Sequence, residues 1–176
     1  MKKNWLTWLP LGLFLGLAAL FIAGLLNPDE RTISSKLVGQ PMPAFDLPAA
    51  ASDRPGLSSR DLATGKPHLL NIFASWCVPC AAEAPQLEAL RQAGVPIMGI
   101  AIRDARADVD GFLARNGNPY EKIGLDARSA VQIELGSSGV PETFLIDGKG
   151  KILHQHIGEI RADDVPAIVA KMKAAQ

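Results

Sequence analysis

The chain contains two cysteines, Cys77 and Cys80, which are separated by Val78 and Pro79 and preceded by Trp76. An apolar run typical of a buried strand comes before them, and helix-favouring residues follow, so we expect Cys77 at a helix N-terminus. Free backbone N–H groups and the helix dipole stabilise a thiolate there, which lowers its pKa. Cys80 lies on the same helical face and could resolve a mixed disulfide formed by Cys77. The spacing therefore indicates a redox-active dithiol.

Other uses of the cysteines are less well supported. A structural zinc needs four ligands, but the chain has no second cysteine pair and its three histidines are His68, His154 and His156. A disulfide across two residues closes a loop too short to stabilise a fold much. His154 and His156 alternate on a predicted strand and could bind copper from one face, although polar positions on a half-exposed strand explain them more simply. We expect no bound metal and no cofactor.

The rest of the chain predicts the elements that would position the dithiol. Strands and helices are expected in alternation: strands over 68–74 and 95–102, helices over 81–93, 107–115, 128–135 and 162–174, and a short extended piece over 120–124. A hairpin is expected where 141–147 and 151–157 flank Gly148-Lys149-Gly150. This order describes an α/β fold with a mixed central sheet flanked by helices.

The N-terminal residues differ from the rest in composition. Residues 5–26 carry no charge and follow Lys2 and Lys3. As a helix they would reach roughly 33 Å, enough for a hydrocarbon core of about 30 Å. A cleaved signal peptide is the alternative, but its apolar core is usually only about 7–15 residues, and Leu26-Asn27-Pro28 makes a poor cleavage site. The sequence therefore predicts an N-terminal transmembrane helix.

The predicted organisation is a membrane anchor over 1–26, a tether over 27–37 and one domain over 38–176. The lysines on the N-terminal side would keep Met1 cytoplasmic and place the domain across the membrane. The chain has 18 basic and 18 acidic residues. Because nucleic-acid-binding proteins concentrate Lys and Arg, this balance excludes DNA and RNA as partners.

Several motifs resemble the thioredoxin fold: Trp-Cys-x-Pro-Cys after a strand, a proline five residues beyond the second cysteine (Pro85), and Val140-Pro141 opening a later strand. More narrowly, the chain resembles the membrane-anchored thiol–disulfide oxidoreductases of cytochrome c maturation, the DsbE/CcmG family. The matching segments are 65–71, 74–80 with Glu83, Gly117-Asn-Pro-Tyr120 and Gly139-Val-Pro-Glu-Thr-Phe-Leu-Ile-Asp147. Asn71 stands where general thioredoxins carry a buried aspartate, in agreement with this family, whereas Ser137-Ser138 departs from its pattern.

The resemblance implies a disulfide reductant in the periplasm, held at the bacterial inner membrane. Family members reduce a disulfide in apocytochrome c, or in a companion maturation protein, and take electrons from a DsbD- or CcdA-type membrane protein. Cys77 would attack the target disulfide and Cys80 would displace the mixed disulfide. Three different functions remain open: a general membrane-anchored thioredoxin-like reductase, an oxidant working in the opposite direction, and a non-enzymatic copper- or haem-handling module that uses the cysteines as ligands.

Two carboxylates could act on the dithiol. Glu83 follows Cys80 by three residues on the same helical face, and Glu142 follows Pro141. A negative charge near Cys77 would disfavour its thiolate, and the family places acidic residues beside the dithiol. The alternative is that Glu83 is an ordinary acid of the first helical turn and Glu142 a solvated charge at a loop edge.

The resemblance also implies a cis Val140–Pro141 bond beside Cys77, because thioredoxin-like folds carry a cis-proline opposite the dithiol. The extended residue before this proline could offer its backbone N–H and C=O to a bound substrate strand. We also expect Cys77 to be the exposed nucleophile and Cys80 the buried resolving cysteine, because only the first cysteine sits at the open helix end.

Overall fold

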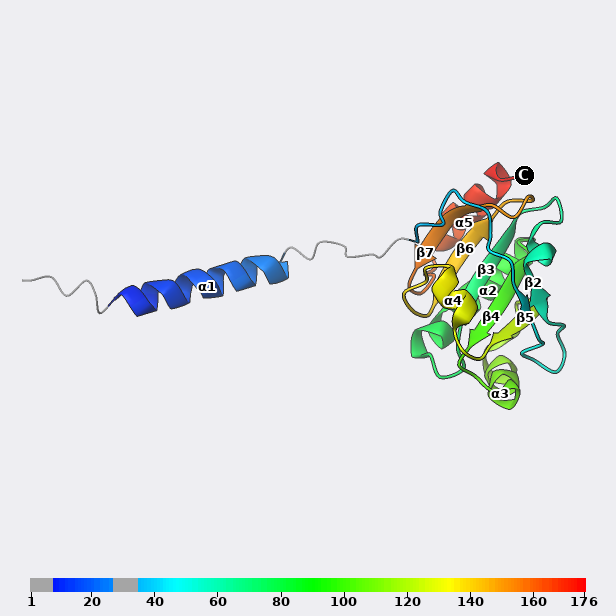
Figure 1. The fold of residues 1–176 in the computed structure, drawn as a ribbon, viewed down its shortest axis with the longest axis horizontal. Coiled ribbons are helices and arrows are strands. Elements are labelled where there is room, and N and C mark those ends of the chain that lie inside the picture. Colours follow the sequence, from blue (N-terminus) through cyan, green and yellow to red (C-terminus); the bar gives the residue numbers. More distant parts are fainter. Residues whose placement is uncertain (1–7, 27–34) are drawn as a thin grey trace, which may run out of the picture. The chain divides into compact units, whose positions relative to one another are not determined.

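The computed structural model describes residues 8–26 and 35–176 (Figure 1). The chain divides into two units, 1–32 and 33–176, of which the first contains the helix α1 (Leu9–Leu26). Within the described residues, no helix combines the length and apolar character that a membrane crossing requires. The predicted transmembrane helix over 5–26 is therefore not confirmed; the helix found in this part of the chain, α1, has 18 residues. Lys2, Lys3 and tether residues 27–34 lie outside the described residues.

The second unit is built on a five-stranded mixed sheet with the strand order β5-β4-β3-β6-β7 (Figure 1). Its strands are β3 (His68–Phe73), β4 (Ile97–Ile102), β5 (Lys122–Asp126), β6 (Glu142–Ile146) and β7 (Ile152–Ile157). β3, β4 and β5 run parallel, whereas β6 and β7 are antiparallel to their neighbours. Every residue of β3, β4 and β6 is buried, which is why these strands are mostly apolar. The predicted mixed sheet and hairpin are confirmed.

Helices flank this sheet: α2 (Val78–Gln92), α3 (Arg106–Asn116), α4 (Ala130–Glu134) and α5 (Asp164–Ala174). α2 packs against α3 and α5 and buries Leu87 and Leu90. It begins three residues before the predicted start, because Pro79 suits the first helical turn, where a missing backbone N–H costs no hydrogen bond. The sequence did not indicate the small additional sheet, in which β1 (Asp46–Leu47) pairs with β2 (Leu57–Ser58).

The strand directions bring several loops to one side of the domain. In the parallel register, Phe73 lies beside Ala101 and Ile102 beside Asp126, so β3, β4 and β5 end together at what we call the carboxyl edge of the sheet. Antiparallel β6 begins at this edge, because Glu142 lies opposite Ile72. The residues after β3 and those before β6 are therefore neighbours in space. Ligand sites of open α/β sheets form at such edges.

Candidate active site

Cys77 is the N-cap of α2 at the carboxyl edge. Its backbone is extended, with φ −88° and ψ 110°, and its Sγ accepts a hydrogen bond from the Cys80 N–H at 3.2 Å. The two cysteines form a disulfide whose Cα atoms are 5.3 Å apart. The predicted placement of the pair at a helix N-terminus is confirmed, and the structure is that of the oxidised protein.

Both sulfurs are nearly covered. Cys77 is 5% exposed and Cys80 2%, whereas Trp76 is 56% and Val78 80% exposed, and Pro79 is also exposed. The prediction of an exposed Cys77 is therefore wrong for this oxidised form, because its sulfur is bonded to that of Cys80 and faces the first N–H groups of α2. Three exposed apolar side chains thus border an almost buried disulfide.

Side-chain hydrogen bonds fasten the loops of the carboxyl edge to one another. The backbone N–H and the hydroxyl of Ser75 both donate to the Asp104 carboxylate at 2.6 Å. The Trp76 indole N–H donates to the Arg103 carbonyl at 3.4 Å, and Arg103 Nε donates to Ser129 Oγ at 2.9 Å. The turn that carries Cys77 is therefore attached to the loop after β4, and through it to the loop after β5.

Glu83 lies in the second turn of α2 and is 1% exposed. Its Oε1 accepts from Asn71 Nδ2 and its Oε2 from the Ile160 N–H, both at 2.9 Å. Burial raises the pKa of Glu83 to about 7, although these two hydrogen bonds act in the opposite direction. The interpretation of Glu83 as a first-turn acid is therefore wrong: it is a buried carboxyl group, one turn after Cys80, that titrates near neutral pH.

Asn71 is the centre of a buried polar cluster. The Tyr120 hydroxyl donates to Asn71 Oδ1 at 2.7 Å, while Asn71 Nδ2 donates to Thr143 Oγ1 at 3.0 Å as well as to Glu83. Burial and the nearby charge of Glu83 raise the pKa of Tyr120 well above its usual value. The sequence motifs contained Asn71, Tyr120 and Thr143 but did not indicate that these residues meet. The feature of the sequence that could have indicated this cluster is the presence of polar residues, such as Asn71 and Thr143, within otherwise apolar strands.

Pro141 lies directly before β6 and is buried. The Val140–Pro141 bond is cis, as predicted. The Pro141 carbonyl accepts from the Gly158 N–H at 3.0 Å. Because Glu142 is opposite Ile72, Pro141 lies at the end of β3 that continues into the turn with Cys77. The cis-proline and the disulfide therefore share the carboxyl edge.

Glu142 is 1% exposed, so its interpretation as a solvated charge is wrong. Its Oε1 accepts from the Ser138 N–H at 2.9 Å, the Ser138 hydroxyl at 2.8 Å and the Gly139 N–H at 3.2 Å. Its Oε2 accepts from Gln155 Nε2 at 2.8 Å. These bonds replace the water that the carboxylate loses on burial. Glu142 thereby holds residues 136–140, which we call the proline loop.

The two histidines of β7 lie outside this cluster. His154 Nε2 is 2.8 Å from the Lys171 ammonium group, and His156 Nε2 is 3.2 Å from the Glu159 carbonyl. Burial, together with the charges of Lys171 and His156, lowers the pKa of His154. Over residues 8–26 and 35–176, no group of three or more His, Cys, Asp or Glu side chains could hold a metal ion. A lysine beside His154 also disfavours a second cation there.

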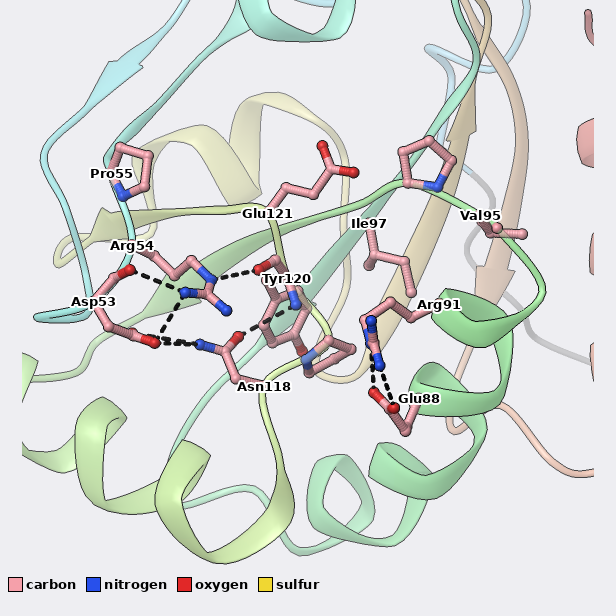
Figure 2. Close-up of a pocket in the computed structure, with 13 residues that line it drawn as sticks. Asp53, Arg54, Pro55, Glu88, Arg91, Val95, Ile97, Asn118, Tyr120 and Glu121 are labelled. Carbon is pink, nitrogen blue, oxygen red and sulfur yellow. Dashed lines mark hydrogen bonds and ion pairs between the residues drawn. The ribbon is translucent and has the colours of Figure 1, made fainter.

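A cavity of about 760 Å³ opens at the opposite end of β4, close to where Val95 and Ile97 lie (Figure 2). Arg54 Nε donates to the Tyr120 carbonyl at 2.7 Å, and Arg91 pairs with Glu88. Both guanidinium groups on its wall are thus already partnered. None of the site residues predicted from the sequence lines this cavity.

Comparisons with known proteins agree with this geometry. The Redoxin family model matches residues 37–172. The chain is 42% identical over 158 residues to the thiol:disulfide interchange protein DsbE of Pseudomonas fluorescens biotype C, covering 90% of this chain and 87% of the relative. It is 36% identical to the thiol:disulfide interchange protein HelX of Rhodobacter capsulatus, with 90% and 89% covered.

Among solved structures, a protein of Chlorobium tepidum described as a thiol:disulfide interchange protein DsbE superposes with a TM-score of 0.62 at 29% identity. The match covers 82% of this chain and 99% of that protein. The predicted thioredoxin-like fold and thiol–disulfide chemistry are confirmed. The chain therefore belongs to the Redoxin family, and within it to the thiol:disulfide interchange proteins of the DsbE group.

Proposed function

We propose that this chain reduces disulfides in the periplasm during cytochrome c maturation, with Cys77 as the nucleophile and Cys80 as the resolving cysteine. The observation that supports reduction of the target, as opposed to its oxidation, is the buried Glu83 one turn after Cys80. A strong oxidant such as DsbA owes its potential to a stabilised reduced form. Above about pH 7, where Glu83 is ionised, a carboxylate near Cys77 has the opposite effect, because it destabilises the thiolate. It therefore favours the oxidised pair and makes the dithiol a better reductant.

The proposed reaction moves two electrons from the dithiol to the target. The Cys77 thiolate attacks one sulfur of the target disulfide, which releases the other as a thiolate and forms a mixed disulfide. The Cys80 thiolate then attacks Cys77 Sγ, which releases the reduced target and leaves the Cys77–Cys80 disulfide seen here. Trp76 and Pro79 would support the site as the exposed apolar border of the disulfide. The target is apocytochrome c or a companion maturation protein.

Continued turnover needs an electron donor. The periplasm is kept oxidising kinetically, so a dithiol there stays reduced only if another protein keeps reducing it. We assign this role to a DsbD- or CcdA-type membrane protein. We further propose that residues 1–26 attach the domain to the inner membrane and that 27–37 act as its tether. The support for this attachment is the uncharged sequence 5–26 after two lysines.

Trapping of partners in cells tests the function. Cys80→Ser leaves Cys77 able to form a mixed disulfide that cannot be resolved, whereas the Cys77→Ser/Cys80→Ser double variant is the matched control. We expect Cys80→Ser to capture apocytochrome c or a maturation protein. Capture of unrelated periplasmic proteins alone would instead identify a general reductase.

Two measurements on the purified protein distinguish a reductant from an oxidant and from a metal- or haem-handling module. We expect a reduction potential closer to that of thioredoxin, about −270 mV, than to that of DsbA, about −120 mV. A value near that of DsbA would identify an oxidant. Stoichiometric copper or haem in protein purified under reducing conditions would identify a metal- or haem-handling module.

A further inference from the structure

The side chain of Gln155, in β7, donates a hydrogen bond to the Glu142 carboxylate. It lies opposite Phe144 in the β6–β7 pairing, so it shares a sheet face with Glu142, two residues before Phe144. Oε1 of Glu142 already accepts three hydrogen bonds from Ser138 and Gly139 of the proline loop. Gln155 therefore restrains the other oxygen of the carboxylate that holds this loop.

The orientation of the Gln155 amide is set by Ser35. The backbone N–H of Ser35 donates to Gln155 Oε1 at 2.6 Å, and Nε2 of the same amide donates to Glu142 at 2.8 Å. A backbone N–H can only donate and a carboxylate can only accept. The amide therefore has one orientation that satisfies both neighbours, and it links Ser35 to Glu142.

Ser35 also contacts the start of the proline loop. It is 6% exposed, and its hydroxyl donates to the Leu135 carbonyl at 2.5 Å and accepts from the Leu37 N–H at 3.0 Å. Gly136 follows with φ +68°, and a Cβ built on it would lie 3.1 Å from Ser35 Oγ. Ser35 is thus connected to Leu135 before the proline loop and, through Gln155, to Glu142 after it.

We infer that Ser35 and Gln155 are positioning residues for substrate binding, which act through Glu142 to hold the proline loop in the shape that receives a polypeptide beside the disulfide. This inference rests on the proposed function, together with the expectation from the sequence that the backbone before Pro141 binds an extended substrate strand. Apart from the bond that the Ser35 hydroxyl accepts from Leu37, the side-chain hydrogen bonds of these two residues join them to each other or to the proline loop and its flanks, and none leads to Cys77 or Cys80. Their loss should therefore change recognition of a polypeptide more than the chemistry of the Cys77–Cys80 pair.

The test compares a polypeptide with a small disulfide as substrates of the reduced full-length protein. The probes are a peptide with an internal C-x-x-C-H disulfide, a peptide with an unrelated internal disulfide, and glutathione disulfide. Gln155→Glu places two carboxylates against each other. It should lower the rate constant with both peptides about tenfold, the equivalent of one lost hydrogen bond. The rate with glutathione disulfide and the reduction potential should not change.

A charge exchange supplies the rescue. In the double variant Gln155→Glu/Glu142→Gln, residue 155 can accept from both Ser35 and residue 142, while residue 142 still accepts from the proline loop. The peptide rates should recover in this variant. Ser35→Ala, which removes the bond to Leu135, should lower the peptide rates, whereas Leu153→Ala, at an exposed position of the same strand, should not.

The inference is overturned if the peptide and glutathione rates fall together, if the reduction potential shifts, if Gln155→Glu leaves the peptide rates unchanged, or if the charge exchange restores nothing. Should Gln155→Glu fail to fold, the peptide-to-glutathione ratio of Ser35→Ala decides in the same way. Wild-type protein that reduces the unrelated peptide but not the C-x-x-C-H peptide would count against the proposed function and leave the comparison of variants valid.

Discussion

Replacing Glu83 by Gln should remove a pH dependence of the stability of the oxidised protein. The pKa of Glu83 is about 7 in the folded chain against an ordinary value of 4.5. Between these values the unfolded chain releases the proton while the folded chain retains it. The contribution of protonated Glu83 to the free energy of unfolding is therefore fully present below pH 4.5. It decreases as the pH rises and is lost once the pH exceeds about 7. The difference between the two pKa values corresponds to about 3 kcal/mol.

Urea unfolding of the oxidised protein at a series of pH values between about 4.5 and 8 measures this effect. The disulfide removes thiol titration from the same range. Wild type should lose about 3 kcal/mol of unfolding free energy across the window, whereas Glu83→Gln should lose much less. Glu134→Gln, at an exposed position of α4, should keep the wild-type slope. A flat wild-type profile, or equal slopes in wild type and Glu83→Gln, would refute the assignment of a raised pKa to Glu83.

Three further predictions concern the dithiol and its buried neighbours. In the reduced protein, Cys77→Ser should abolish disulfide reduction and Cys80→Ser should accumulate mixed disulfides; faster alkylation of Cys80 than of Cys77 at neutral pH would reverse these roles. Glu83→Gln should lower the pKa of Cys77, measured by thiolate absorbance, and the shift should persist in high salt because this carboxylate is buried; an unchanged titration removes Glu83 from the dithiol's environment. Tyr120→Phe removes the hydroxyl that donates to Asn71 Oδ1, so the Asn71 amide can turn its oxygen towards the Glu83 carboxyl group. The pKa of Glu83 should then rise, and the pH at which its contribution to unfolding free energy is lost should rise with it. An unchanged pH dependence of unfolding would contradict this.

Local sequence was enough to predict the elements around the dithiol. β3 and β4 are buried on both faces, and their apolar runs showed them directly. The turn residues Gly148 and Gly150 indicated the hairpin that became β6 and β7. The cis bond before Pro141 came from the family resemblance, because base rates alone favour a trans bond.

The surroundings of the two acids could not be predicted in this way. An acidic side chain is normally exposed, so residue type alone favoured solvated positions for Glu83 and Glu142. Each acid has a partner that is remote in sequence: Ile160 is 77 residues from Glu83, and Gln155 is 13 residues from Glu142, although Ser138 and Gly139 are local to Glu142. Only the folded sheet brings these donors together, and the burial of both acids depends on them.

The near-complete burial of the disulfide has a consequence for selectivity. Thiol–disulfide exchange depends on access to the sulfur that is attacked as well as on the driving force. With Cys77 5% and Cys80 2% exposed, most collisions with small thiols meet Trp76, Val78 or the surrounding backbone instead of sulfur. A partner must bring a matching surface before its own cysteine can approach. The oxidised pair is thus kinetically insulated from the general thiol pool, and electrons pass between proteins that fit each other.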